Sequence, residues 1–255
     1  MPSRATSTGG VDGAEPGAGE LSRALRETLE LRHPAVAIAF VSAQPEGVET
    51  FDGGQVPSAC TFWRRAEERL FFAPAEAHMN CPIGAMTMGF AMTDAQQSHL
   101  MELVGQMGEI GYVDPAEAAN IPAVPGEKSG IVYGPLEGFP LDPDVVLAWV
   151  SGRSAMLLDE ATGASTWTPE QTGLMTYGRP SCAAVAMSVL SARPTMSVGC
   201  SGMRIFTGID PDLNLAVLPR EILADLPERL TATVRANAQM ADYYNEQKQQ
   251  LAAAT

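Results

Sequence analysis

Four cysteines in this 255-residue chain form two pairs with similar surroundings. Cys60 and Cys81 lie 21 residues apart in the first pair, and Cys182 and Cys200 lie 18 residues apart in the second. Each cysteine follows a small or polar residue and stands where a helix is predicted to begin. Unpaired backbone N–H groups and the positive end of the helix dipole stabilise a thiolate at such a position. The pattern predicts four thiols that could meet at one centre.

Four thiolates are the ligand set of a [4Fe–4S] or [2Fe–2S] cluster, or of a structural zinc ion. The sequence has no Cys-x-x-Cys pair and none of the ferredoxin spacings, so the fold would have to gather the ligands from four separate segments. Two other interpretations stay open. One cysteine, with Cys81 the first candidate, could act without metal as a nucleophile or redox thiol. All four could instead be core residues, because cysteine is among the most buried residue types.

Two arginines near the cysteines are candidates for binding a small anion. Arg204 lies near the start of the helix predicted after Cys200, where a cation is unfavourable with the helix dipole and could be placed to meet an anion. Arg179, just before Pro180, is the second candidate. A solvated surface position is the simpler interpretation for both side chains.

Other residues next to the cysteines could complete a ligand pocket. His78 and Asn80 lie just before Cys81, and His78 could serve as a general acid or base or as a substitute metal ligand. Gly202, two residues after Cys200, would let the backbone approach a bulky bound group. An ordinary hydrogen-bonding histidine and an ordinary turn glycine are the alternatives.

Apolar runs of strand length alternate with helical patterns along the chain. The run at 35–41 is continuous, as expected of a strand buried on both faces. Further strands are predicted over residues 70–73, 131–133, 145–150, 195–198 and 213–218. Strands alternating with helices indicate an α/β fold with a mixed or mostly parallel sheet covered by helices.

The order of features repeats once along the chain. Residues 36–42 resemble residues 145–151, and the two cysteines of each half follow in the same order. Gly89 and Gly208 occupy matching places after the second cysteine of each half. This order predicts two pseudo-symmetric halves. A centre between them would be well placed, since clefts between related halves are common ligand sites.

These patterns divide the chain into three parts. Residues 1–19 are rich in Gly, Pro, Ser and Ala and are predicted to be a disordered leader. Residues 20–225 form a single α/β domain, whose related halves span about 20–125 and 126–225. Residues 226–255 are predicted to form a C-terminal helix. It would cap the domain or pack against a second subunit, which makes a homo-oligomer one expected form of the protein.

Composition excludes several classes of protein. The formal net charge of −14, from 30 acidic and 16 basic residues, argues against nucleic acid and anionic membranes as partners. No apolar run approaches the roughly 20 residues that span a bilayer, and the N-terminus has no apolar core of the signal-peptide type. We expect a cytoplasmic protein with reduced thiols. There is no P-loop, strand-anchored G-x-G-x-x-G, G-x-S-x-G or H-E-x-x-H motif to support nucleotide binding, serine hydrolysis or zinc proteolysis.

The cysteine segments resemble the DUF169 family of uncharacterised prokaryotic proteins. The matching motifs are Asn80-Cys81-Pro82-Ile83-Gly84, Pro143-Asp144-Val145-Val146-Leu147, Pro180-Ser181-Cys182 and Gly199-Cys200-Ser201-Gly202-Met203-Arg204. The resemblance covers roughly Leu21 to Leu230. It implies that cysteines belong at these four positions, which favours a shared site over accidental burial. It names no reaction.

The combined expectation is an iron–sulfur protein with a redox or electron-transfer role. The cluster, [4Fe–4S] in preference to zinc, would be held by Cys60, Cys81, Cys182 and Cys200 between the two halves. A pocket for a small anionic ligand would lie beside it, lined by Arg204, Asn80, His78 and Gly202. Whether the protein is an enzyme stays open, with an oxidoreductase or a lyase as the candidates. The alternatives are a metal-free cysteine enzyme or redox-sensing thiol protein, and a binding module with core cysteines.

Overall fold

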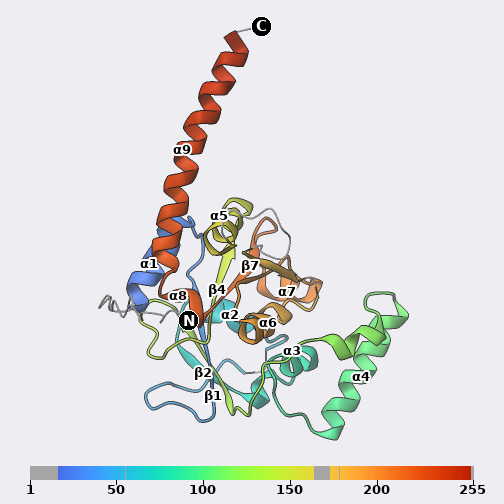
Figure 1. The fold of residues 1–255 in the computed structure, drawn as a ribbon. Coiled ribbons are helices and arrows are strands. Elements are labelled where there is room, and N and C mark those ends of the chain that lie inside the picture. Colours follow the sequence, from blue (N-terminus) through green and yellow to red (C-terminus); the bar gives the residue numbers. More distant parts are fainter. Residues whose placement is uncertain (1–16, 55, 164–172, 178, 254–255) are drawn as a thin grey trace, which may run out of the picture.

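The computed structural model describes residues 17–54, 56–163, 173–177 and 179–253 (Figure 1). At its centre, the described residues form one seven-stranded sheet with the order β2-β3-β1-β4-β7-β6-β5. The strands are β1 (Val36–Val41), β2 (Phe71–Pro74), β3 (Gly130–Pro135), β4 (Val145–Val150), β5 (Met175–Tyr177), β6 (Thr195–Ser197) and β7 (Asn214–Pro219).

Helices cover both faces of this sheet. One face packs against α1 (Ala18–Thr28), α5 (Gly152–Gly163), α8 (Arg220–Leu223) and the start of α9 (Leu226–Ala253). The other face packs against α2 (Thr61–Arg65), α3 (Pro82–Thr87), α6 (Ala183–Ser191) and α7 (Ser201–Thr207). The four helices that begin at the cysteines therefore all lie in one layer.

Burial on both faces explains the uninterrupted apolar strands. All six residues of β4 are buried. Val145, Leu147 and Trp149 join the core under the cysteine-bearing helices, while Val146 and Ala148 join the core under α1, α5 and α9. Side chains alternate between the two faces of a strand, so a strand covered on both sides needs apolar residues at every position.

The α/β class is confirmed, and the sheet is of the mixed kind. Among the described strands only β5 and β6 pair in parallel, and the other five pairings are antiparallel. Two strands joined by a helix are parallel when the helix carries the chain back to the end of the sheet at which the first strand began. Here β1 instead lies between β3 and β4, antiparallel to both, although β3 and β4 are consecutive in the chain.

The strand order places corresponding elements of the predicted halves at corresponding positions. From the centre outward the first half contributes β1, β3 and β2, and the second contributes β4, β7, β6 and, at the edge, β5. In each half the third strand from the centre, β2 or β6, lies in the chain between the two cysteine helices, α2 and α3 or α6 and α7. The pseudo-symmetry of the halves themselves stays a prediction.

One segment distinguishes the first half from the second. After α3 the chain forms α4 (Asp94–Glu109) and the 3₁₀ helix η2 (Pro115–Asn120) before it reaches β3. After α7 it reaches β7 within a few residues. The other 3₁₀ helix, η1 (Ala75–His78), leads from β2 towards α3. We call residues 90–127 the α4–η2 segment.

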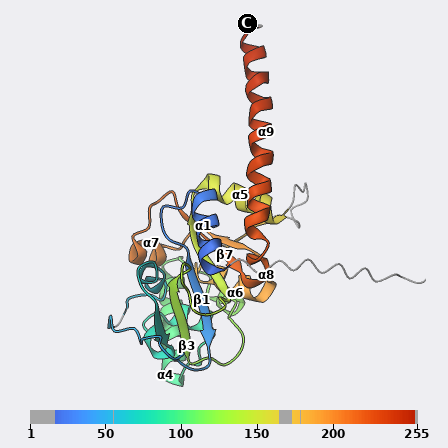
Figure 2. The ribbon, with the colours of Figure 1, turned by 90° about the vertical axis from the view of Figure 1, so that its left-hand side faces the viewer.

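The ends of the chain differ in how they meet the domain. Helix α1 begins at Ala18, so the last residues of the predicted leader are helical, and residues 1–16 lie outside the described part of the chain. Helix α9 begins at Leu226, where a terminal helix was expected, and packs on α5 and α1 before it projects away from the domain (Figures 1 and 2). Its contact with a second subunit stays a prediction. None of the described helices combines the length and apolar content that a membrane crossing requires.

Two glycines, one after α3 and one after α7, allow a matched test of how the α4–η2 segment packs on the domain. Gly89 and Gly208 both have positive φ, at 76° and 61°. A Cβ atom on Gly89 would lie 1.9 Å from the Val124 carbonyl oxygen, whereas one on Gly208 would meet no atom within 4 Å. The left-handed conformation alone costs a residue with a side chain about 1–2 kcal/mol.

We therefore predict that Gly89→Ala lowers the free energy of unfolding by more than about 3 kcal/mol, since backbone must move as well. Gly208→Ala should cost only about 1–2 kcal/mol. Urea denaturation of both variants measures the difference. Equal losses for the two variants would show that the α4–η2 segment does not pack against Gly89 as described.

Candidate functional site

The four cysteines line one pocket of about 300 Å³ on the helical face of the sheet. Each is the residue that immediately precedes a helix: Cys60 before α2, Cys81 before α3, Cys182 before α6 and Cys200 before α7. The sequence prediction that every cysteine begins a helix is thus confirmed. Segments that are distant in the chain therefore bring four thiols to one cavity.

Contacts between the two halves hold the cysteines in place. Helix α2 of the first half packs on α7 of the second. The Thr87 hydroxyl, at the end of α3, lies close enough to the Cys182 thiol to offset part of the rise in its pKa. Each half therefore supplies part of the surroundings of the other half's cysteines.

The serines of the two Pro-Ser motifs form hydrogen bonds with the cysteines of the site. The Ser58 hydroxyl lies 2.6 Å from Cys60 Sγ, within hydrogen-bond distance. The Ser181 hydroxyl accepts a 2.6 Å hydrogen bond from the backbone N–H of Cys200. The sulfur of Cys200 in turn accepts from the Met203 N–H at 3.4 Å. These bonds fix the backbone next to the thiols without occupying the pocket.

Burial opposes ionisation of two of the thiols. The pKa of Cys60 is raised to about 12, chiefly by burial and to a smaller extent by negative charge on Cys81 and Cys200. The pKa of Cys182 is also raised, first by complete burial and then by the charges of the other three cysteines. The expectation that a helix start makes these two thiols acidic is wrong, because desolvation outweighs the field of a short helix.

The charges of the cysteines also affect one another. Cys60 interacts with Cys81 and Cys200, and Cys182 interacts with all three others. Four neighbouring thiolates would repel one another strongly unless cations lay between them. All four cysteines are free thiols here.

The α4–η2 segment supplies an apolar wall over the thiols. Leu103, Val104 and Met107 of α4 line the pocket, together with Val113 and Ile121. The segment is fastened at Tyr112. Its ring lies 4.3 Å from the Arg179 guanidinium, and its hydroxyl accepts a 3.3 Å hydrogen bond from the Ser201 N–H. The pocket is thus walled by thiols on the domain side and by apolar side chains on the other.

Two of the predicted ligand-binding residues line this pocket. They are Asn80 and Gly202. The Asn80 amide donates to the Val56 carbonyl oxygen at 3.2 Å, which holds it against the neighbouring loop. At Gly84, an added Cβ atom would come within 2.9 Å of Cys81 Sγ, so a glycine is required for the thiol to sit where it does.

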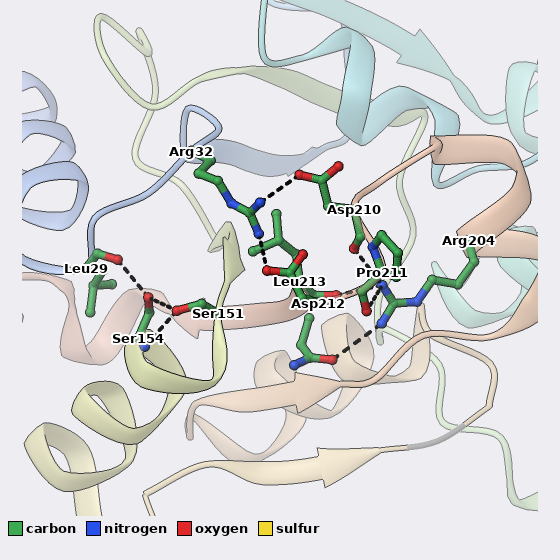
Figure 3. Close-up of polar contacts among 10 residues, drawn as sticks. Leu29, Arg32, Ser151, Ser154, Arg204, Asp210, Pro211, Asp212 and Leu213 are labelled. Atoms are coloured by element: carbon green, nitrogen blue, oxygen red, sulfur yellow. Dashed lines mark hydrogen bonds and ion pairs between the residues drawn. The ribbon is translucent and has the colours of Figure 1, made fainter.

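Arg204 is not among the residues that line the pocket. Its guanidinium donates to the carbonyl oxygens of Leu213 at 2.7 Å and of Asp210 at 3.1 Å (Figure 3). It also donates to the carbonyl oxygen of Val198. These bonds tie the loop between α7 and β7 to the start of α7. Arg179, the second candidate, does line the pocket.

His78 is likewise not a lining residue. It is 1% exposed, and its ring nitrogens lie 2.9 Å from the Pro74 carbonyl oxygen and 3.0 Å from the Tyr133 hydroxyl. Aromatic rings of Phe62 and Phe90 pack on it. The contacts of His78 therefore lie within the aromatic core and not with the thiols.

Sequence reasoning missed several residues of the pocket. Trp63 lines it and lies one helical turn after Cys60, so the helix predicted after Cys60 could have pointed to it. Tyr112, Asp114 and Glu117 come from the α4–η2 segment. Only the fold places that segment over the cysteines, and no signal in its sequence indicates this.

Cysteine thiolates are ligands that both an iron–sulfur cluster and a zinc ion take. Within the described ranges, no group of three or more His, Cys, Asp or Glu side chains is arranged to hold one metal ion.

Fold and site together define a class: a three-layer α/β protein with a four-cysteine pocket in one helical layer. The model of the DUF169 family, described as uncharacterised ArCR, matches residues 24–229, and the chain belongs to this family. An uncharacterised protein of the archaeon Methanocaldococcus jannaschii, MJ0308, is 26% identical over 220 residues, which cover 83% of this chain and 92% of that protein. No solved structure gives a significant match.

Thiol labelling tests the geometry of the pocket directly. In the folded protein without metal, Cys60 and Cys182 should react with iodoacetamide more than about 100-fold more slowly than Cys81 and Cys200. The first two are buried, and a pKa of about 12 leaves Cys60 only about one part in ten thousand ionised at pH 8. Mass spectrometry of timed samples measures the rates. In urea all four rates should converge, and equal rates in the folded protein would contradict the burial described.

The buried His78 predicts a pH dependence of stability. Burial lowers its pKa to about 4, whereas in the unfolded chain it titrates near 6.5. Below pH 6.5 the unfolded state therefore gains a proton that the folded state does not. Stability from this group is complete above pH 6.5 and falls by about 3 kcal/mol as the pH falls to 4.

Urea denaturation at pH 7 and pH 4 checks this expectation. The decrease in the free energy of unfolding from pH 7 to pH 4 should be smaller by about 3 kcal/mol in His78→Gln than in the natural protein. His99→Gln is the matched control, because His99 is exposed and its replacement should leave the loss unchanged. A His78→Gln variant with the same pH profile as the natural protein would refute the buried, neutral state.

Proposed function

We propose that the protein binds an iron–sulfur cluster, [4Fe–4S] in preference to zinc, through Cys60, Cys81, Cys182 and Cys200. The observation that carries this proposal is that four thiols from four separate helix starts line one pocket. Burial alone does not require such convergence, because core cysteines have no reason to share a cavity.

The electrostatics of the pocket support a metal-bound state. Cys60 and Cys182 resist ionisation in the free protein, since each would place a charge in a buried site beside other sulfurs. Iron supplies the positive charge that makes four neighbouring thiolates favourable and is bound only after the thiols lose their protons. The backbone N–H groups at the helix starts then donate to electron-rich sulfur, as the Met203 N–H already does to Cys200.

The chemistry of an all-cysteine site favours electron transfer or redox sensing. When bound, a cluster supplies reversible one-electron chemistry, and four cysteine ligands leave no iron open to a substrate. The apolar side chains of the α4–η2 segment cover part of the pocket beside the thiols. Free cysteines suit the reducing conditions of the cytoplasm, which we propose as the location.

Fewer of the predicted polar residues line the small-anion pocket than the sequence indicated. The side chains of Arg204 and His78 form their hydrogen bonds outside the pocket, so this part of the proposal now rests on Arg179 and Asn80. Asp114 and Glu117 also line the cavity and would repel an anion.

Anaerobic reconstitution with Fe²⁺ and sulfide tests the proposal. The brown protein should contain about four iron and four sulfide ions per chain and show thiolate-to-iron absorption bands. Each single Cys→Ser variant should lose most of the iron. Ser201→Ala is the matched control, because Ser201 is exposed next to Cys200 and does not line the pocket.

The contrary result is also well defined. A colourless, iron-free protein whose circular dichroism shows a folded domain would overturn the cluster. A single thiol that then reacts much faster than the rest, with Cys81 the first candidate, would favour a metal-free cysteine enzyme.

A further inference from the structure

Trp63, a residue that lines the cysteine pocket, carries a buried hydrogen-bond donor without a partner. It lies on α2, three residues after Cys60, and is 1% exposed. Its side chain lines the same pocket as Cys60 and Cys182. The indole Nε1 is buried and has no hydrogen-bond partner within the described part of the chain.

The neighbouring tryptophan shows that this is not a general property of the core. Trp149 packs beside Trp63 with ring centroids 6.4 Å apart, and its Nε1 donates to Glu67 Oε1 at 2.9 Å. Buried N–H groups in proteins nearly always have a partner, because an unpaired one has lost its water and gained nothing. Among the described side chains the other unpaired buried polar atom is the Thr61 hydroxyl, which does not line the pocket.

The chemistry of the pocket indicates the missing acceptor. An indole N–H only donates, so its partner must carry lone pairs. A protonated thiol is a weak acceptor, whereas a thiolate or a sulfide ion is a strong one. The buried donor without a partner therefore belongs to a residue of the same pocket as four sulfurs, which are strong acceptors when they ligate a metal.

We infer that the Trp63 N–H donates a hydrogen bond to an anionic sulfur of the metal-bound site, either a cysteine thiolate or a sulfide. This inference rests on the proposed function. Such a bond stabilises the more negative, reduced state of a cluster and so raises its reduction potential. Trp63 is therefore a positioning and tuning residue, one that touches the bound group without ligating iron.

The first experiment uses Cd²⁺ as a diamagnetic probe of the thiolates in the full-length protein. Nitrogen-15 labelling of the three tryptophans gives three indole N–H signals. The Trp63 signal is assigned by its loss in Trp63→Phe. If that variant does not fold, it is the signal that remains in both Trp149→Phe and Trp167→Phe. On Cd²⁺ addition the Trp63 proton should shift downfield and exchange more slowly with water, while the Trp149 signal stays in place.

The thiolate-to-cadmium absorption band distinguishes failure of this inference from failure of the proposed metal site. If the band appears and the Trp63 signal does not move, this inference is overturned and the metal site stands. If the band does not appear, the thiols do not bind a thiolate-seeking metal, and both proposals are overturned.

The second experiment measures the reduction potential of the reconstituted protein by anaerobic voltammetry. Trp63→Phe keeps an aromatic ring but removes the N–H, so the potential should fall. Trp149→Phe removes an N–H that already has a partner and should leave the potential unchanged, although it destabilises the fold. Equal potentials in all three proteins would overturn the tuning role, and equal shifts in both variants would assign the effect to packing.

Discussion

The antiparallel pairing of β1 with β4 is the constraint on which the rest of the structure depends. Three residue pairs make this seam: Val36 with Leu147, Ala37 with Val146, and Ile38 with Val145. It joins the first half of the chain to the second at the centre of the sheet, with β3 and β7 outside it on either side. Because a one-residue slip would exchange the two faces of a strand, this register also fixes which face each helix covers.

The cysteine site follows from that seam. With both halves in one sheet, α2, α3, α6 and α7 lie in one layer, and their starting residues surround one cavity. Short helices are enough for this purpose, since what matters is where each begins. The α4–η2 segment then encloses the cavity from outside and is held there by Tyr112, through Arg179 and the Ser201 N–H. The site is therefore assembled by long-range packing between segments that are far apart in the chain.

The balance of burial and charge in this cavity gives it a chemical character. Desolvation keeps Cys60 and Cys182 protonated in the free protein, and Trp63 offers a donor that neutral thiols use poorly. The neutral thiols are compatible with burial, whereas a buried donor without a partner is unfavourable. The donor would gain a strong acceptor if the sulfurs bound a metal, and this is the physical reason to connect the pocket with the proposed metal binding.

The amino-acid sequence alone predicts local features: the apolar strands, the cysteines that precede helices and a terminal helix from residue 226. These depend on neighbouring residues, whose periodicity and capping preferences are visible in a single chain. It also indicated that the four cysteines belong to one site. Four features come from the tertiary structure: the mostly antiparallel pairing of the sheet, the high pKa of Cys60 and Cys182, the hydrogen bonds of Arg204 to carbonyl oxygens, and the position of the α4–η2 segment over the pocket. Each of these depends on desolvation or on contacts between distant segments, and neither is encoded in the spacing of residues along the chain.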